Sequence, residues 1–318
     1  MAQNEYVAGV DVGGTKCLAV VIDEENNIVA ESRVATPSGT DALIEVAVEV
    51  TRELAEVAGG LSAAGFGVPG QLDFQGKMRF APNLVDVGEL AIRERLLAVL
   101  DVPVFVDNNA NCAATAELAM GAAADSRQAV LITLGGGFGN SIIVDGVVQR
   151  GAHGLAGELG HSMVDPNGPP CPCGRVGCLE RYASGSGLTR LAQEAAGSGK
   201  APSLLTYTDG DVELVRGEHV MRAVRDQHDD AIEVLEGFSW WVAVGMANVV
   251  AILDPELIVL GGSLVAEWDL LEEPVTRNYR EMVLAGRTRE PVKIVPAAMG
   301  ERAGALGAAI AARSADDT

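Results

Sequence analysis

The sequence VDVGGTKCLAVVID, residues 10–23, decides the fold because it recurs as ITLGGGFGNSIIVD, residues 132–145. The two stretches align without a gap, and their paired glycines, Gly13–Gly14 and Gly135–Gly136, fall at the same place. Each copy predicts an apolar strand, a glycine turn and a second strand that leads through an Asp-containing bend to a third. The third strands are expected at 28–34 and 147–149. This self-similarity predicts a duplicated chain in which each half opens with a β-meander.

Helical and strand patterns alternate after each meander. Helices are predicted at 41–58, 87–100, 110–120, 231–253 and 270–285, and short buried strands at 63–68, 104–106, 257–260 and 292–295. Strands that alternate with helices indicate an α/β chain with mixed sheets covered by helices. A chain of 318 residues exceeds what one compact core usually reaches. We therefore expect a small lobe at 1–120 and a large lobe at 121–301, with a helix near 302–313 that returns to the first.

Charge and hydropathy exclude several classes of partner. The net charge is −21, from 44 acidic and 23 basic residues, and it opposes binding to nucleic acid or to an anionic membrane surface. The most apolar run, 240–253, is shorter than the roughly 20 residues that span a bilayer, and Asn248 interrupts it. The helix around it is predicted to be core or contact surface. The start MAQNEY lacks a signal pattern and free cysteines suit a reducing interior, so we expect a cytoplasmic location.

The segment ELGHSMVDPNGPPCPCGRVGCLE, residues 158–180, gathers three of the five cysteines beside a histidine. The four potential donors are His161, Cys171, Cys173 and Cys178. Three thiolates and one imidazole form a tetrahedral set that favours zinc, and a full set leaves no open position for a catalytic water. We therefore predict a structural zinc in the loop 161–178. A disulfide between two of these cysteines is the alternative, which the odd number of cysteines disfavours. Cys17 and Cys112 lie in apolar runs typical of buried small residues.

The sequence FVDNN, residues 105–109, places an acid and two amides directly after an apolar strand. Polar groups at that position in open α/β sheets usually meet ligand. Asp107 is predicted to be a general base, because phosphorylation of a hydroxyl needs a carboxylate within reach of its proton. The other interpretation is a turn that caps the next helix. In a combined reading, Asn109 is the cap and Asp107 does the chemistry.

Backbone N–H groups at the two glycine turns can approach anionic oxygens closely, so the pair of hairpins predicts a polyphosphate site. Neither hairpin is a Walker loop or a Rossmann fingerprint. Asp11 precedes the first turn and is expected to bind Mg²⁺ through water, with Thr15 and Lys16 close to phosphate oxygens. A purely structural hairpin, with Lys16 as a solvated strand residue, is the alternative.

A second polar set suits a polyhydroxylated ligand. Its members are Asn83, Glu158, His161 and Glu180. Carboxylates and amides satisfy sugar hydroxyls in pairs, and a dehydrated site of this kind rejects molecules without those hydroxyls. His161 is expected to give one ring nitrogen to zinc and the other to a ligand hydroxyl. Zinc would then hold the shape of the sugar site.

At these residues the sequence resembles the ROK family of sugar kinases, and within it the bacterial glucokinases. The resemblance covers nearly the whole chain. Its motifs are DVGGTK at 11–16, GVPG at 67–70, APNL at 81–84, DNNA at 107–110, GLAGELGH at 154–161, CPCGRVGCLE at 171–180 and LDPELIVLGG at 253–262. It implies an actin-like ATPase fold, the duplicated ribonuclease H-like α/β fold with two lobes around a central cleft.

The resemblance also implies an activity and its site residues. The activity is phosphorylation of the 6-hydroxyl of glucose by ATP with Mg²⁺, with Asp107 as base and zinc on the four donors above. The implied hexose contacts are Asn83, Asn108, Glu158, His161 and Glu180, and the implied nucleotide contacts are Asp11, Gly13, Gly14, Thr15, Lys16, Gly135, Gly136, Gly137, Gly261 and Gly262. Family precedent favours a homodimer or tetramer.

The sequence departs from the family pattern in its second hairpin. Relatives usually carry GTGxGGG there, whereas this chain has GGGFGNS at 135–141 and lacks the threonine hydroxyl. We expect nucleotide binding to be retained, either weaker or with another phosphoryl donor such as polyphosphate. Two alternative functions stay open: a kinase for N-acetylglucosamine, N-acetylmannosamine, fructose or allose, and a non-catalytic sugar sensor. Family repressors carry a DNA-binding helix-turn-helix domain ahead of the motif that here reads DVGGTK. Only ten residues precede Asp11, so no such domain is expected.

Overall fold

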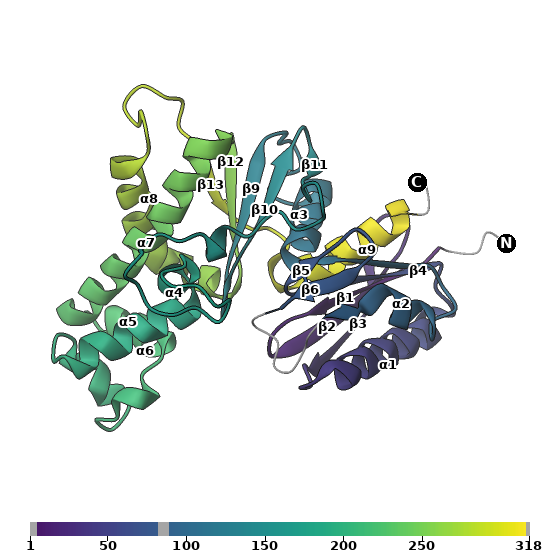
Figure 1. Cartoon of the computed structure of the whole chain (residues 1–318), viewed down its shortest axis with the longest axis horizontal. Coiled ribbons are helices and arrows are strands. Elements are labelled where there is room, and N and C mark those ends of the chain that lie inside the picture. The colour runs from purple at the N-terminus through teal and green to yellow at the C-terminus, as the bar shows by residue number, and fades with distance from the viewer. Residues whose placement is uncertain (1–4, 82–88, 316–318) are drawn as a thin grey trace. The chain divides into compact units, whose positions relative to one another are not determined.

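The computed structural model describes residues 5–81 and 89–315 (Figure 1). The chain forms two compact units. Among the described residues, unit 1 contains the chain up to 131, residues 141–157 and the chain from 297 onward, and unit 2 contains 132–140 and 158–296. The sequence predicted lobes at 1–120 and 121–301. These boundaries remain a prediction, separate from the two units described above.

The first five-stranded sheet has the order β3-β2-β1-β4-β8. Its strands are β1 (Val7–Val12), β2 (Lys16–Ile22), β3 (Ile28–Ala35), β4 (Ala63–Val68) and β8 (Val104–Asn108). The meander β1-β2-β3 is antiparallel, whereas β1, β4 and β8 run parallel to one another. The predicted meander and the two short strands after it are therefore present.

The second five-stranded sheet has the order β11-β10-β9-β12-β13. Its strands are β9 (Ala129–Leu134), β10 (Phe138–Val144), β11 (Val147–Val148), β12 (Leu257–Gly261) and β13 (Lys293–Pro296). The two sheets share one spatial order: when the five strands of a sheet are numbered along the chain, they lie side by side as third, second, first, fourth and fifth. The duplication and the mixed α/β sheets predicted from the two glycine hairpins are confirmed.

Helices cover both faces of the first sheet (Figure 1). They are α1 (Thr40–Ala58) on one face, and α9 (Ala303–Ala315) with α3 (Asn109–Met120) on the other. Successive side chains of a strand point to opposite faces. Accordingly, Ala8 belongs to the core cluster that contains the apolar residues of α1, whereas the adjacent Val7 belongs to the cluster that contains Leu306 of α9.

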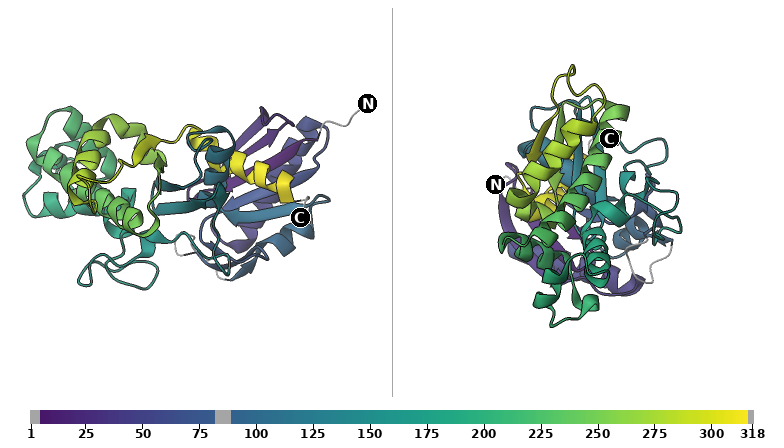
Figure 2. Two further views of the ribbon diagram at one scale, coloured as in Figure 1. Left: turned by 90° about the horizontal axis from the view of Figure 1, so that it is seen from above. Right: turned by 90° about the vertical axis from the view of Figure 1, so that its left-hand side faces the viewer.

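Helix α9, yellow in Figure 2, packs against the first sheet, and it contacts β1 and β4. A Cβ atom at Gly9 would lie 2.0 Å from the Ala305 carbonyl oxygen, and one at Gly65 would lie 1.9 Å from the Ala308 carbonyl oxygen. Real Cβ atoms do not approach an oxygen so closely, so glycine is required at both positions. The contact holds the last described helix on the first sheet.

The helices of unit 2 pack around α7 (Asp229–Leu253). Its neighbours are α4 (Glu180–Ala183), α5 (Gly185–Gly197), α6 (Gly217–Arg225) and α8 (Trp268–Met282). Among the described residues α7 is the one helix long and apolar enough to cross a membrane, and just over half of its most apolar window is buried in the protein. Phe238 and Val242 are buried while Trp240 is 45% exposed. This packing identifies α7 as a core helix.

Several elements were not predicted from the sequence. A three-stranded sheet contains β5 (Gln71–Leu72), β6 (Lys77–Phe80) and β7 (Leu90–Ala91). The helix predicted at 87–100 is the shorter α2 (Ile92–Leu97), because residues 90–91 pair with β6. The helices α4, α5 and α6 and five 3₁₀ turns also escaped prediction. The turns are η1 (Leu159–His161), η2 (Pro202–Tyr207), η3 (Val212–Leu214), η4 (Ser263–Glu267) and η5 (Gly300–Arg302).

The close contact of α9 predicts the effect of Gly65→Ala. The added methyl group must displace the α9 backbone, so we expect the free energy of unfolding to fall by about 1–3 kcal/mol. The midpoint of thermal unfolding, measured by circular dichroism, should fall with it. Gly237→Ala in α7 is the matched control, because a Cβ there meets no atom within 4 Å and alanine favours a helix. A Gly65→Ala protein that melts with the wild type would contradict the proposed role of this glycine.

Candidate active site

The register of the parallel strands places two acids in one row of the first sheet. Asp11 of β1 pairs with Gly67 of β4, and Gly67 pairs with Asp107 of β8. Paired residues of parallel strands point to the same face, and neighbouring strands lie about 4.8 Å apart, so the two acids are about 10 Å apart along the row. Gly67 between them has no side chain. The row therefore collects the predicted magnesium ligand and the predicted base near the carboxyl ends of these parallel strands.

Asp107 is almost fully enclosed, with 7% of its side chain exposed. Its Oδ1 accepts hydrogen bonds from the Asn108 backbone N–H at 2.7 Å and from Asn111 Nδ2 at 3.1 Å. Its Oδ2 forms an ion pair with Arg150 Nε at 3.1 Å. Burial raises the pKa of Asp107, and the Arg150 charge and these hydrogen bonds oppose that rise. The group is an ionisable carboxylate with raised basicity, as a general base requires.

Asn108, not Asn109, caps helix α3. Asn108 Oδ1 accepts from the backbone N–H groups of Ala110 and Asn111, and its Nδ2 donates to the Gly70 carbonyl at 3.0 Å. The predicted cap was wrong by one residue because β8 continues through Asn108 before the helix starts. The hexose contact expected of Asn108 stays a prediction. Asn83 lies outside the described residues.

Asp11 has a carboxylate oxygen without a protein partner. The residue is partly exposed as a whole, but its Oδ1 is buried and accepts no hydrogen bond in the described structure. Burial raises the pKa of Asp11 to about 7, against the opposing charge of Lys16. A Cβ at Gly304 would lie 2.5 Å from Asp11 Cγ, so the glycine makes room for the carboxylate. An orphaned buried carboxylate oxygen fits a hydrated Mg²⁺ ion, whose ligands are oxygens.

The first glycine hairpin is open at its tip. A Cβ at Gly14 would meet no atom within 4 Å, and the Gly13 N–H donates to the Lys16 carbonyl. Lys16 Nζ forms an exposed ion pair with Glu301 at 2.9 Å. The backbone of the turn is therefore accessible to an anion, while the Lys16 side chain has a protein partner at the surface.

The second hairpin contacts two other segments of unit 2. Gly262 has a φ of 90°, and a Cβ there would lie 2.4 Å from the Leu134 carbonyl oxygen. This brings the two segments predicted to contact nucleotide, 135–137 and 261–262, side by side. The backbone N–H of Gly185, at the start of α5, donates to the Gly135 carbonyl at 2.7 Å. No local pattern predicted this contact between the start of α5 and the hairpin.

The structure also brings together three predicted hexose contacts in unit 2. Glu180 is buried at the start of α4, and its Oε2 accepts from the Phe138 N–H at 2.9 Å. Glu158 Oε2 lies 4.0 Å from His161 Nε2. Burial and, second, the Glu180 charge raise the pKa of Glu158 to about 7. Asn140 Oδ1 holds this turn by accepting from the Leu159 N–H at 2.8 Å.

The four predicted zinc donors converge. One ligand atom of each of His161, Cys171, Cys173 and Cys178 lies within 4.8 Å of all the others. The Cys173 and Cys178 sulfurs are 3.5 Å apart, and Cys171 Sγ is 3.7 Å from His161 Nδ1. A tetrahedral zinc with its usual bond lengths needs edges of about 3.8 and 3.6 Å for these two kinds of pair. All five cysteines are free, so the disulfide alternative is not formed. The cluster fits a structural zinc ion.

The backbone of the zinc loop depends on glycine. Gly174 and Gly177 have φ values of 86° and 60°, and a Cβ at Gly177 would lie 1.6 Å from the Asp165 carbonyl oxygen. The Cys171 N–H donates to the Arg175 carbonyl at 2.7 Å and closes the turn. His161 presents Nδ1 to the cysteines and Nε2 to Glu158. One imidazole therefore links the metal cluster to the acidic pair.

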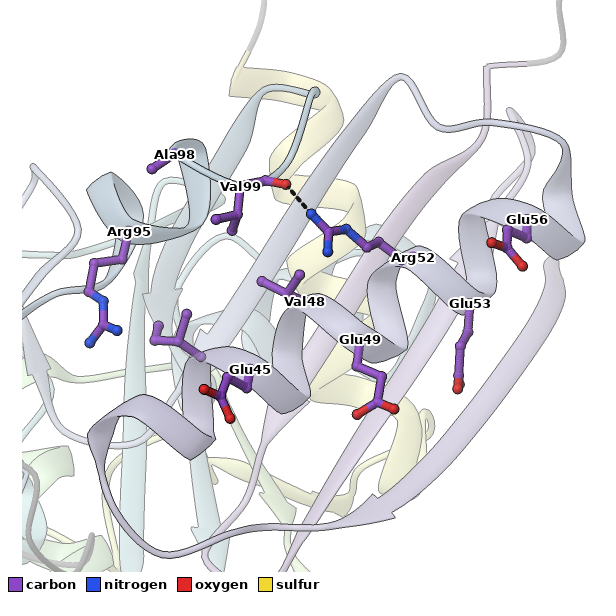
Figure 3. A pocket seen from close by; sticks show the side chains of 10 residues that line it. Glu45, Val48, Glu49, Arg52, Glu53, Glu56, Arg95, Ala98 and Val99 are labelled. Carbon is purple, nitrogen blue, oxygen red and sulfur yellow. Dashed lines mark hydrogen bonds between the residues drawn. The ribbon is translucent and has the colours of Figure 1, made fainter.

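A hollow of about 730 Å³ on unit 1 lies away from these residues (Figure 3). It is lined by α1 and the end of α2. Glu45, Glu49, Glu53 and Glu56 make it acidic, and Arg52 donates across it to the Val99 carbonyl at 2.7 Å. It contains none of the predicted site residues, and its acidic lining does not suit a polyphosphate.

The chain is similar over nearly its whole length to known proteins. A glucokinase from Streptomyces coelicolor is 36% identical over 97% of this chain and 98% of its own length. The structure of a ROK glucokinase from Streptomyces griseus in complex with glucose and AMPPNP has a TM-score of 0.88 and 34% identity, and the match covers 97% of this chain and 99% of that one. A xylose repressor from Bacillus subtilis is 26% identical over 95% of this chain and 75% of its own length.

The two sheets of like strand order and their helices define an actin-like ATPase fold of the sugar kinase type. The model of the ROK family matches residues 7–315, so the chain belongs to the ROK family. The fold and the family implied by the sequence motifs are confirmed.

Sequence reasoning missed the residues that support Asp107. They are Arg150, Asn111 and Ser141, whose Oγ donates to Asn111 Oδ1 at 2.8 Å. Asn111 could have been noticed, because it lies four residues after Asp107, in the first turn of the helix that follows β8. Nothing local distinguishes Arg150 from the other basic residues, since its contact depends on how the chain returns after β11.

The zinc cluster predicts the effect of Cys173→Ala. Loss of one thiolate breaks the tetrahedral set, so we expect the zinc content measured by mass spectrometry to fall from about one ion per chain to a small fraction, with a lower melting temperature. Cys17→Ala is the matched control and should keep its zinc, because Cys17 is buried in the first sheet. Undiminished zinc in the Cys173→Ala protein would exclude this ligand set.

Proposed function

We propose that this protein is an ATP-dependent hexose kinase that phosphorylates the 6-hydroxyl of glucose to give glucose 6-phosphate. The observation that carries the proposal is the enclosed Asp107 carboxylate at the end of β8, in a chain alignable over nearly its full length with a glucokinase that binds glucose and AMPPNP. A buried base in this position suits proton removal from an alcohol. The two glycine hairpins suit the phosphoryl donor.

In the proposed reaction Asp107 accepts the proton of the 6-hydroxyl. The oxygen forms a bond to the γ-phosphorus of ATP as the bond to the β,γ-bridging oxygen breaks, and ADP leaves with that electron pair. The proton stays on Asp107 until solvent removes it. Burial makes the carboxylate more basic, while Arg150 keeps it from being protonated too readily.

The donor phosphates are proposed to bind the backbone N–H groups of the hairpins at 13–16 and 135–137. Those groups are fixed dipoles that stabilise negative charge without rearrangement. Asp11, with its unpartnered Oδ1, would hold the water shell of Mg²⁺. The ion supplies charge neutralisation for the phosphates when bound.

Hexose recognition is assigned to Glu158, His161 and Glu180, with Asn83 and Asn108 as the further contacts. Carboxylate oxygens accept from sugar hydroxyls, and the enclosed setting of Glu158 and Glu180 makes an unpaired oxygen costly. A sugar that lacks a matching hydroxyl therefore binds poorly. Zinc on the neighbouring loop would fix the orientation of His161.

We further propose a cytoplasmic location, a homodimer or tetramer, and no nucleic acid or membrane partner. The net charge of −21 supports the exclusion of polyanionic partners. Sedimentation equilibrium on the purified chain measures the subunit number.

The experiment that tests the function is ADP release by the purified protein with a panel of sugars. We expect glucose to give the highest kcat/KM, above N-acetylglucosamine, N-acetylmannosamine, fructose and allose, and glucose 6-phosphate as the product. Polyphosphate in place of ATP tests the donor, because the second hairpin lacks a threonine hydroxyl. A protein that binds glucose but releases no ADP is a sensor and not a kinase.

Asp107→Asn is the sharpest variant. The amide cannot take the proton but has nearly the same shape, so we expect kcat to fall by about 10²–10⁴-fold while glucose binding by calorimetry persists. Asp145→Asn is the matched control at an exposed acid of unit 1 and should keep the wild-type rate. Normal turnover by the Asp107→Asn protein would remove Asp107 from the role of base.

A further inference from the structure

Arg150, whose charge opposes the rise in the pKa of Asp107, is itself held in a defined position beside the carboxylate. It lies between β11 and the glycine-rich stretch at 151–157, and only 21% of its side chain is exposed. Its Nε is 3.1 Å from Asp107 Oδ2. A guanidinium this enclosed loses much of its hydration, so its attraction to the carboxylate is far less screened than in an exposed pair.

Two aromatic rings fix the position of this guanidinium. Arg150 Cζ lies 5.1 Å from the centre of the Phe74 ring and 5.8 Å from the centre of the Phe105 ring. A planar guanidinium stacks on aromatic faces and is attracted by their negative surface. Phe105 precedes Asp107 by two residues on β8, and Phe74 follows β5. The cation is therefore held by the same strand that carries the base.

The other oxygen of Asp107 is held from the opposite side. Asn111 Nδ2 donates to Oδ1, and Ser141 Oγ fixes the Asn111 amide by donating to its Oδ1. Ser141 and Asn111 are almost fully buried, with exposures of 0% and 2%. Oδ1 thus has two donors, the Asn108 N–H and Asn111 Nδ2, which use both of its lone pairs. Oδ2, which contacts Arg150, still has a lone pair left for a substrate hydroxyl.

We propose that Arg150 is a positioning residue for phosphoryl transfer: through its ion pair it aims Asp107 Oδ2 and keeps the carboxylate ionised until the hydroxyl arrives. This inference rests on the proposed function, since it needs Asp107 to act as the base. Arg150 acts through Asp107 and is assigned no contact with the substrate.

The sign of the pH effect follows from the groups around Asp107. The titratable groups that face it are Arg150 and the Cys112 thiol of α3, and Asp11 also acts on Cys112. Burial raises the pKa of that thiol well above its ordinary value, so it is neutral across the useful pH range. A base works only when ionised, so activity falls as pH drops through its pKa. Removal of the Arg150 charge raises the pKa of Asp107 further, and activity is then lost at higher pH.

The test compares Arg150→Met and Arg150→Lys with the wild type. For Arg150→Met we expect kcat at neutral pH to fall about 10- to 100-fold with little change in KM, and the acid limb of the kcat profile to move up by about one pH unit or more. Arg150→Lys restores the charge without the planar fork, so its acid limb should return toward the wild type while kcat recovers only in part. Arg127→Met, which removes an exposed cation of unit 1, is the matched control.

A merely structural role for Arg150 predicts a different pattern. The melting temperature would fall, and kcat would drop equally at every pH, with no shift of the acid limb and no recovery of that limb by lysine. That pattern in folded Arg150→Met protein overturns the inference.

A measurement without turnover separates this inference from the proposed function. Carbon-13 labelling of aspartate carboxyls, with the Asp107 signal assigned from the Asp107→Asn spectrum, reports the pKa of Asp107 directly. We expect a higher pKa of Asp107 in the Arg150→Met protein whether or not the chain phosphorylates glucose, and an unchanged pKa would overturn the inference. If the wild-type protein releases no ADP with glucose, the proposed function fails. The titration still shows whether Arg150 lowers the pKa of Asp107.

Discussion

Parallel pairing of β1, β4 and β8 is the constraint on which the site in unit 1 depends. The pairing fixes Asp11, Gly67 and Asp107 in one row. A slip of one residue in any of these strands would turn its side chain to the opposite face, into the apolar cluster beneath α1. The buried side chains that flank each acid therefore specify the register, and with it the place where two carboxylates meet polar partners.

The sequence predicted the fold because its two glycine hairpins repeat, and because strand and helix periods alternate clearly after each. It also predicted the zinc cluster, since all four donors lie within 18 residues and their convergence needs only a local loop. Contacts between residues far apart in the sequence could not be predicted from local patterns. Arg150 reaches Asp107 from 43 positions away, and the Ser141 hydroxyl reaches Asn111 from 30. The Asn108 cap was missed because the end of β8 depends on pairing with β4.

Carboxylates are prominent among the predicted site residues of each unit, and three of them have different surroundings. Asp11 has a buried carboxylate oxygen without a hydrogen-bond partner. Burial and the charge of Glu180 raise the pKa of Glu158, and the charge of Arg150 opposes the rise that burial causes in the pKa of Asp107. The pKa values of Asp11 and Glu158 are raised to about 7, so these two groups accept or release protons readily at physiological pH, and small changes in their partners alter their charge. Positive charge from a substrate-bound ion or donors from sugar hydroxyls would favour the ionised forms.

The return of α9 to the first sheet has a consequence for how the chain folds during synthesis. The strands β1, β4 and β8 leave the ribosome long before residues 303–315, because all of unit 2 intervenes. Until α9 emerges, the side of the sheet that holds Val7, Leu18 and Val20 lacks the helix that buries it. The nascent polypeptide therefore lacks the helix that covers this apolar surface until nearly the whole chain has been made, and a surface exposed in this way favours aggregation of incomplete chains.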